Sequence, residues 1–264
     1  MILTFSKLPA DRQFFDLSLW PAPLANVFVR LLHRRLAIRP EWFVLLSLAS
    51  GIALSGFLLV HNTHRGILLL LIFCRAFFDN VDGMWARATH TVSTLGGLLD
   101  LTTDMVCNIL LLLSLGYRLF HATGSFSAIP LTLLAFLLMH LSMTYYSLHY
   151  FLYQHEGSLP DSRFVEGDWK DVLRPLVRIY RLSWRLLALV VLRLPRPSAP
   201  PTRRFLSGLS IFGLGSHFLY LAVCVLFFKA QDLIYAELAL GAVFSGFLVL
   251  QKNFPVHPSG TDKS

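Results

Sequence analysis

The sequence predicts an all-α fold: a polytopic membrane protein with six transmembrane helices and cytoplasmic amphipathic interfacial helices. The first observation is composition, since 55% of the 264 residues are hydrophobic and only 14% are charged, against about 25% charged in an ordinary soluble domain. The second is a mean hydropathy of +0.60, which comes from repeated apolar runs long enough to cross a bilayer. A soluble globule, a disordered chain, a collagen and a coiled coil are therefore excluded.

Six apolar runs supply the predicted spans, which in chain order cover residues 42–60, 65–78, 98–120, 126–153, 205–228 and 233–250. The second run is too short by itself to cross about 30 Å of hydrocarbon at about 1.5 Å per residue. Its helix must therefore continue into the polar stretch after Phe78, and this places charged side chains at some depth in the membrane.

The basic residues predict the orientation of these spans. Six spans put both termini on one side, and that side would carry 19 of the 23 Lys and Arg residues, against three in the opposite loops. Because basic residues concentrate on the cytoplasmic side, we expect both termini to be cytoplasmic, in a bacterial inner membrane or the endoplasmic reticulum. The net charge of +8 is explained by this topology, so no nucleic-acid partner is expected.

We expect residues 1–264 to form a single membrane domain with two segments outside the spans. Residues 1–40 would be a cytoplasmic or interfacial segment with an amphipathic helix over 23–37, and residues 154–204 a basic cytoplasmic loop. Five basic side chains of this loop share one helical stripe: Lys170, Arg174, Arg178, Arg181 and Arg185. They predict an interfacial helix, started or kinked by Pro175, that binds anionic membrane lipid; the alternative is a solvated linker with basic topology markers.

The most informative stretch joins the second and third predicted spans and holds four of the fifteen acids in the chain: Asp79, Asp82, Asp100 and Asp104. The first two are three residues apart and the last two are four apart, so each pair shares one face of a helix. Because the connection between the helices is short, we expect them to be antiparallel neighbours whose acidic pairs converge.

Structural roles for these acids would be helix capping, pairing with Arg75 and Arg87, or lining a polar crevice. However, two carboxylates about 5 Å apart repel by about 3 kcal/mol at an effective dielectric constant of about 20, and four acids contain six such pairs. Two arginines are too few to neutralise them, so either the acids are protonated or divalent cations lie among them. Oxygen ligands select Mg²⁺, Mn²⁺ or Ca²⁺, and two ions about 4 Å apart suit displacement at phosphorus.

Small and basic residues accompany the acids. Gly83 follows Asp82 directly and Gly96 precedes Asp100 by four positions, so backbone without side chains leaves room for a bulky ligand. Ala86 extends this gap, and the guanidinium of Arg87 offers a fork for a phosphate group.

The complete pattern is Asp79-x2-Asp82-Gly83-x2-Ala86-Arg87-x8-Gly96-x3-Asp100-x3-Asp104. At every fixed position it resembles the signature of the CDP-alcohol phosphotransferase (phosphatidyltransferase) family. The resemblance implies a membrane enzyme that joins a CDP-linked group to an alcohol and releases CMP, with two divalent ions, Mg²⁺ or Mn²⁺. It also implies roles for the signature residues: Asp79, Asp82, Asp100 and Asp104 as metal ligands, Gly83, Ala86, Arg87 and Gly96 as the lining of the CDP pocket, and Asp104 as the general base.

The donor and the acceptor are less narrowly indicated. The length of the chain favours phosphatidyl transfer from CDP-diacylglycerol to a small polar alcohol. Asn80 is similar to the branch that uses CDP-choline or CDP-ethanolamine with diacylglycerol, and this is the alternative. Residues 99–104 look more like the phosphatidylinositol synthase branch, which usually has a basic residue where Met105 stands. After Pro40 the chain departs from the Pro-Asn-x-x-Thr-like sequence with which many members open the first span.

Two other classes of protein are compatible with the acids, namely a divalent-cation transporter and a catalytically silent scaffold. Arg75 either pairs with Asp79 or binds an anionic headgroup. The histidines of the fourth span and its exit, at positions 140, 149 and 155, are interpreted as a polar seam rather than as ligands. Ser47, Gly51 and Ser55 form a small-residue stripe that predicts close helix packing and a homodimer.

Overall fold

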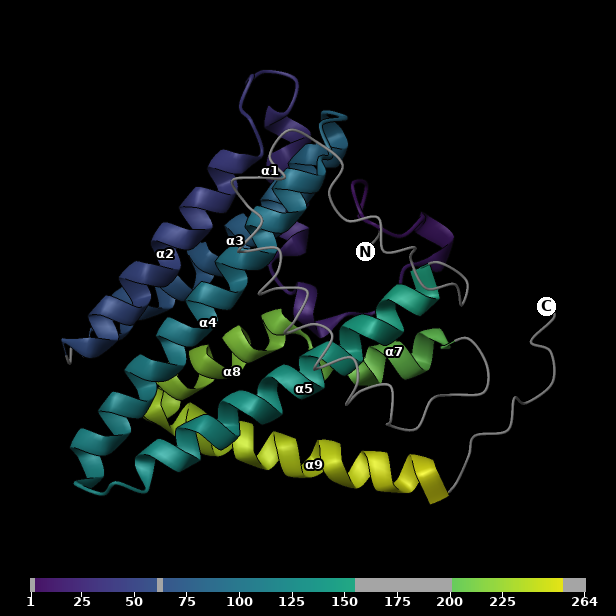
Figure 1. Cartoon of the computed structure of the whole chain (residues 1–264). Helices are drawn as coiled ribbons and strands as arrows, with labels where there is room; N and C mark the ends of the chain where they lie inside the picture. The colour runs from purple at the N-terminus through teal and green to yellow at the C-terminus, as the bar shows by residue number, and fades with distance from the viewer. Residues whose placement is uncertain (1–2, 61–63, 155–200, 254–264) are drawn as a thin grey trace.

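The structure is a computed structural model that describes residues 3–60, 64–154 and 201–253. Every regular element in these ranges is a helix, so the all-α prediction is confirmed for the described chain. Helices α2, α3 and α4 run side by side, and α5, α7, α8 and α9 form a second group that crosses beneath them (Figure 1). The predicted interfacial helix within residues 154–204 lies almost entirely outside the described residues.

The N-terminal segment contains two short 3-10 helices, η1 (Ala10–Arg12) and η2 (Leu17–Leu19), before helix α1 (Ala22–Leu32). Helix α1 starts one residue before the predicted amphipathic helix and ends five residues earlier than predicted. Its buried residues pack against α3, while Leu24, Val27 and Leu31 are exposed apolar residues on its outer side. The helix therefore has two apolar faces, and its place in a membrane interface remains a prediction.

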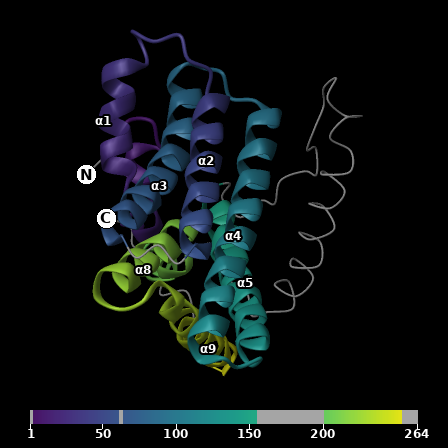
Figure 2. The same ribbon diagram turned by 90° about the vertical axis from the view of Figure 1, so that its left-hand side faces the viewer.

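Helix α2 (Glu41–Leu59) packs against both α3 (Arg65–Ala88) and α4 (Thr94–Thr123), as Figure 2 also shows. As predicted, α3 continues ten residues past Phe78 through the polar stretch. Helix α4 begins where the Ser93 hydroxyl caps the Gly96 amide and ends at Gly124, which has the left-handed backbone (φ 65°) that glycine adopts without strain. These boundaries place the four signature acids near one end of both helices.

The small-residue stripe of α2 packs inside the chain. Ser47, Gly51 and Ser55 are all buried, and a Cβ added at Gly51 would overlap the Cys107 thiol of α4. The close helix packing predicted for this stripe is thus confirmed within one molecule. The homodimer remains a prediction, because the stripe already has its partners.

The second half of the described chain comprises α5 (Ala128–Gln154), α7 (Arg203–Leu209), η4 (Ser210–Phe212), α8 (Leu214–Phe227), η5 (Ala230–Asp232) and α9 (Leu233–Asn253). The predicted fifth span is not one straight helix, because α7 and α8 meet at an angle of 49°. Gly213 is extended at the break and Gly215 lies just beyond it, and a Cβ at either glycine would overlap Ser18. The N-terminal segment therefore packs into the bend, which sequence periodicity does not reveal.

Within the described residues, four helices are long and apolar enough to span a membrane, namely Glu41–Leu59, Leu95–Thr123, Ala128–Gln154 and Ala230–Leu250. The number is five if the bent pair of α7 and α8 counts as one span. Helix α3 has 24 residues but carries Arg75, Asp79, Asp82 and Arg87. The predicted count of six spans is therefore not confirmed, and the residues that set α3 apart are those of the site.

Candidate active site

A cavity of about 390 Å³ lies where the acidic ends of α3 and α4 meet the N-terminal segment and the end of α5. This volume lies in the range typical of small-molecule sites. Its lining includes all four signature acids, together with Asn80, Gly83 and Arg87. The remaining lining residues come from outside the signature: Leu3, Ser6, Lys7, Asp16, Ser18, Leu19, Met84, Tyr146, Ser147, Tyr150, Phe151 and Gln154.

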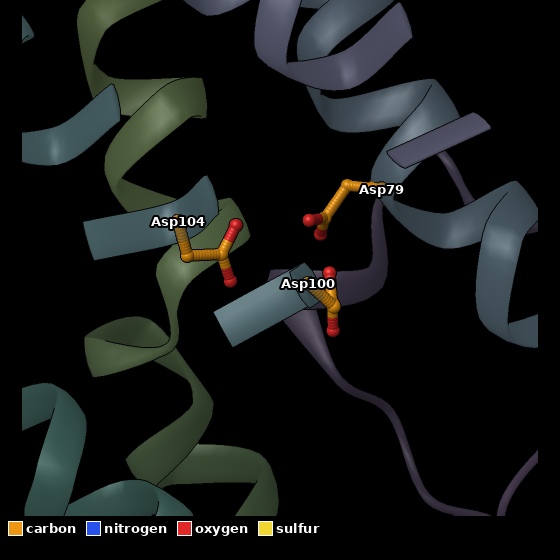
Figure 3. A group of neighbouring side chains, drawn as sticks. All are labelled: Asp79, Asp100 and Asp104. Atoms are coloured by element: carbon orange, nitrogen blue, oxygen red, sulfur yellow. The ribbon is translucent and has the colours of Figure 1, made fainter. Parts of the chain in front are cut away.

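Three of the signature acids form a cluster at this cavity. Asp79 of α3 and Asp100 and Asp104 of α4 each present a carboxylate oxygen, and these oxygens all lie within 4.8 Å of one another. Figure 3 shows the three side chains turned toward one another. Asp100 and Asp104 share a face because they are one helical turn apart, and packing of both helices on α2 brings that face to Asp79.

Asp82 lines the same cavity but is not part of the three-acid cluster. Its Oδ1 atom accepts a hydrogen bond from the Gly83 amide. Three positions along an α-helix rotate a side chain by about 60° around the helix and shift it by about 4.5 Å along it. Asp82 therefore leaves α3 in a different direction from Asp79. The prediction that both pairs converge thus holds for three acids, while Asp82 lines the same cavity outside the cluster.

Arg75 lies behind the acids and is fully buried (0% exposed). Its Nη1 donates to Asp79 Oδ1 at 3.1 Å and its Nη2 donates to Asp104 Oδ1. The Arg75 guanidinium also donates to the Ser47 hydroxyl, which in turn donates to the Arg75 carbonyl oxygen at 3.1 Å. Of the two roles considered for Arg75, the structure shows the pairing with Asp79, and it adds the pairing with Asp104.

The donor set suits a hard divalent cation. In their ionised forms, three carboxylates with oxygens this close outnumber the one arginine that pairs with them. Carboxylate oxygens are the ligands that Mg²⁺ and Mn²⁺ prefer. Arg75 does not line the cavity, so its ion pairs orient two of the acids without filling the space before them. The residues present therefore fit a metal centre.

The four residues predicted to line a nucleotide pocket divide into two groups. Gly83 and Arg87 line the cavity; Arg87 Nε donates to the Phe5 carbonyl oxygen at 2.7 Å, and its Nη1 would lie 3.2 Å from a Cβ at Gly83. Ala86 and Gly96 are not among the lining residues. The Gly96 amide donates to Ser93 Oγ at 3.0 Å, so Gly96 lies in the capped first turn of α4.

The sequence did not single out Asp16, Ser18, Tyr146 and Tyr150, although all four line the cavity. The sequence feature that could have identified the α5 residues is the run of polar tyrosine and serine side chains within an otherwise apolar helix. No sequence feature identifies Asp16 as a residue of the site. Burial raises the pKa of Asp16, while hydrogen bonds from Ser18 and Tyr146 act in the opposite direction.

The histidines do not contribute to the described cavity. His140 and His149 each contact a backbone carbonyl oxygen of α5 through Nδ1, at 3.0 and 2.8 Å, and neither lines the cavity. This is consistent with the predicted packing role. His155 lies outside the described residues.

The family model for CDP-alcohol phosphatidyltransferase matches residues 37–240, more than three quarters of the chain. The chain belongs to this family. It is therefore a transferase of CDP-alcohol phosphatidyl groups, with a CDP-alcohol donor and an alcohol acceptor, and together with its apolar helices this makes it an integral membrane protein. The family gives no support to cation transport. No curated protein and no solved structure matches the chain.

Proposed function

We propose that this CDP-alcohol phosphatidyltransferase transfers the phosphatidyl group of CDP-diacylglycerol to a hydroxyl of a small polar alcohol and releases CMP, in phospholipid biosynthesis. The observation that carries the proposal is the convergence of Asp79, Asp100 and Asp104 on a cavity that Gly83 and Arg87 also line. The cavity thus combines an acidic cluster with the guanidinium group of Arg87 and with the backbone of Gly83, which carries no side chain. A diphosphate substrate requires groups of these kinds.

The metal ligands proposed are the four signature acids. Asp79, Asp100 and Asp104 would hold one of two divalent ions, Mg²⁺ or Mn²⁺, and Asp82 would help to hold the other from its separate place in the cavity. Bound ions of this kind would offset the charge of the diphosphate and of the leaving CMP.

The residues around the acids would position the donor. Arg87 faces the bare backbone of Gly83, where it can pair with a phosphate oxygen of the CDP group. Ala86 and Gly96 lie on the same helices without lining the cavity, and we propose that they admit the cytidine close to the backbone. Together these contacts would hold the distal phosphorus toward the acids.

Asp104 would act as the general base for the acceptor. The acceptor oxygen attacks the distal phosphorus of the diphosphate, a new P–O bond forms, and the bond from that phosphorus to the bridging oxygen breaks. CMP leaves with the electron pair, and the hydroxyl proton passes to Asp104. Arg75 donates to Oδ1 of Asp104, which fixes the orientation of the carboxyl group before the reaction.

We further propose that the cavity opens to the cytoplasm, with both termini on that side, in a bacterial inner membrane or the endoplasmic reticulum. The distribution of the basic residues supports this orientation. The donor would then enter from the bilayer and the alcohol from water. Anionic membrane lipid and a second copy of the chain are the further proposed partners.

A second candidate is the transfer of phosphocholine or phosphoethanolamine from CDP-choline or CDP-ethanolamine to diacylglycerol. The observation that favours it is Asn80, the residue that resembles this branch, because Asn80 lines the cavity. In the first candidate the CDP-linked donor carries the lipid, whereas in the second the acceptor is the lipid. A comparison of the two kinds of donor therefore separates them.

The test is CMP release by the purified protein with Mg²⁺ or Mn²⁺ in lipid nanodiscs. One arm supplies CDP-diacylglycerol with inositol, inositol phosphate, glycerol phosphate, serine or choline, and the other supplies CDP-choline or CDP-ethanolamine with diacylglycerol. Release in the first arm alone is expected. Release in the second arm alone would replace the first proposal with the second, and release in neither arm, or equal release by an Asp100→Asn variant, would refute both.

A further inference from the structure

The N-terminal strap, defined as residues 3–20, lies outside the part of the chain that the family model matches. It nevertheless supplies nearly a third of the cavity lining, and several of these side chains are polar. The strap residues that line the cavity are Leu3, Ser6, Lys7, Asp16, Ser18 and Leu19. A segment beyond the shared family core thus completes the walls around the shared catalytic acids.

Hydrogen bonds at several points hold the strap in place. At one end the Phe5 carbonyl oxygen accepts from Arg87 Nε at 2.7 Å. Near its middle, Arg12 donates to the Tyr153 carbonyl oxygen, and the Tyr153 hydroxyl donates to the Arg12 carbonyl oxygen at 3.0 Å. At the other end Trp20 Nε1 donates to the Gly215 carbonyl oxygen at 3.0 Å. The strap is therefore an integral wall rather than a loose tail.

Asp16 is the acid of the strap that lines the cavity, and it is separate from the signature acids. Its Oδ1 accepts from the Ser18 amide at 3.0 Å and from the Ser18 hydroxyl at 2.6 Å. Its Oδ2 accepts from the Tyr146 hydroxyl of α5 at 2.5 Å. All three residues line the cavity, so the strap and α5 present a fixed carboxylate with two hydroxyl groups on it.

We propose that this wall binds the acceptor alcohol, with Asp16 and Tyr146 recognising the hydroxyl groups of a polyol. The inference rests on the proposed function and assigns its acceptor class. Oδ1 of Asp16 already accepts two bonds from Ser18, but Oδ2 accepts only the bond from Tyr146 and can accept one more, and the Tyr146 oxygen that donates to Asp16 can also still accept. A molecule with several adjacent hydroxyl groups can therefore donate one hydrogen bond to Asp16 and another to Tyr146.

Two basic side chains line the cavity among its acids. Lys7 and Arg87 leave a neutral polyol unaffected and attract a phosphorylated one. The hydroxyl groups of Ser147 and Tyr150 extend the same lining. The wall therefore offers many hydrogen-bonding groups to a molecule with several hydroxyl groups.

Two variants distinguish recognition of the acceptor from a purely structural role of Asp16. Asp16 is the N-cap of η2, and asparagine caps a helix about as well as aspartate. An Asp16→Asn variant therefore keeps the cap and the shape of the strap and loses the carboxylate charge. A Tyr146→Phe variant keeps the ring and loses the hydroxyl. Asp11→Asn is the matched control, since Asp11 belongs to the strap but does not line the cavity.

The test measures KM for the acceptor and for CDP-diacylglycerol separately, with inositol, glycerol phosphate, serine and choline as acceptors. We expect activity with the polyols, and we expect Asp16→Asn and Tyr146→Phe each to raise the KM for the polyol by about tenfold or more, the loss given by a hydrogen bond to a charged group. The KM for the donor and the thermal unfolding temperature should match those of Asp11→Asn. The double variant should lose less than the product of the single effects, because the two groups act on one another.

Transfer to serine or choline with none to a polyol would overturn the inference and leave the proposed function intact. So would a polyol KM in Asp16→Asn and Tyr146→Phe equal to that of Asp11→Asn, or a donor KM that rises in step with that of the acceptor. Absence of CMP release from the wild-type protein with every acceptor would instead refute the proposed function, and the inference with it.

Discussion

Arg75 of α3 donates a hydrogen bond to Asp104 of α4, so the last acid of the signature is paired with an arginine that precedes the first acid by one helical turn. The same guanidinium donates to Asp79. One buried cation thus links the two acidic helices at the level of the cavity. It compensates two of the three clustered carboxylates from behind, while the cavity side stays free for a substrate.

Arg75→Met is expected to destabilise the protein, because two partly buried carboxylates, Asp79 and Asp104, lose the fully buried cation that pairs with both. Breaking a buried ion pair by removal of one partner costs about 3–5 kcal/mol. Thermal unfolding in detergent should show a lower midpoint, and added Mg²⁺ or Mn²⁺ should recover part of the difference because the cation replaces some of the lost charge. Arg30→Met, at an exposed position of α1, is the control. A variant as stable as this control in metal-free buffer would contradict the pairing.

Asp100→Asn is expected to stabilise the protein in the absence of metal and to make it less stable than the wild type when metal is present. Arg75 bonds Asp79 and Asp104, and Asp100 adds a third carboxylate to that cluster. In metal-free buffer near neutral pH, a neutral amide at this position avoids the repulsion that a third carboxylate meets when it ionises, and should stabilise the protein by about 1–3 kcal/mol. With Mg²⁺ or Mn²⁺ present the wild type should be the more stable, because metal binding adds stability only where the ligands are complete.

The measurement is the unfolding midpoint of both proteins in EDTA and across a metal titration. Curves that cross are expected. A variant that is less stable than the wild type in EDTA would show that Asp100 has a stabilising partner in place of the repulsion inferred here.

Asp104→Asn is expected to reduce CMP release by about 100-fold to 10,000-fold, the usual contribution of a general base. The amide can still accept a hydrogen bond from Arg75, so the fold should be retained. Asp232→Asn is the matched control, since Asp232 Oδ2 accepts from the Lys229 amide at 3.0 Å, a bond that asparagine also makes. Activity of Asp104→Asn close to that of Asp232→Asn would refute the catalytic role of Asp104.

Much of the site could be predicted because local spacing determines it. Asp100 and Asp104 share a face by helical periodicity alone, and the continuation of α3 past Phe78 follows from the length needed to cross a bilayer. The clustering of Asp79 with them is expected from the short connection between the helices, and in the structure it comes about because both helices pack on α2. The signature therefore predicts the family correctly, as the match to the family model confirms.

What the sequence could not reveal depends on contacts between distant segments. Asp16 meets Tyr146 across 130 positions, and no periodicity relates the two residues. The close packing at the bend between α7 and α8 is similar, because Ser18 occupies the space where a Cβ at Gly213 or Gly215 would lie. Ala86 and Gly96 show the converse, since their place in the pattern does not put them in the cavity lining.

Gly51→Ala is expected to destabilise the protein by about 1–3 kcal/mol, the cost of inserting a methyl group into a packed core. The added Cβ would overlap the Cys107 thiol and lie 3.4 Å from Arg75 Cδ, so the helices that carry the site would have to separate. Gly56→Ala is the control on the same helix, because a Cβ there meets no atom within 4 Å. A Cys107→Ala change should recover part of the loss in the double variant, because it removes the overlapping sulfur. Thermal unfolding of the four proteins measures this coupling, and additive effects would show that α2 and α4 are not as closely packed as the structure has them.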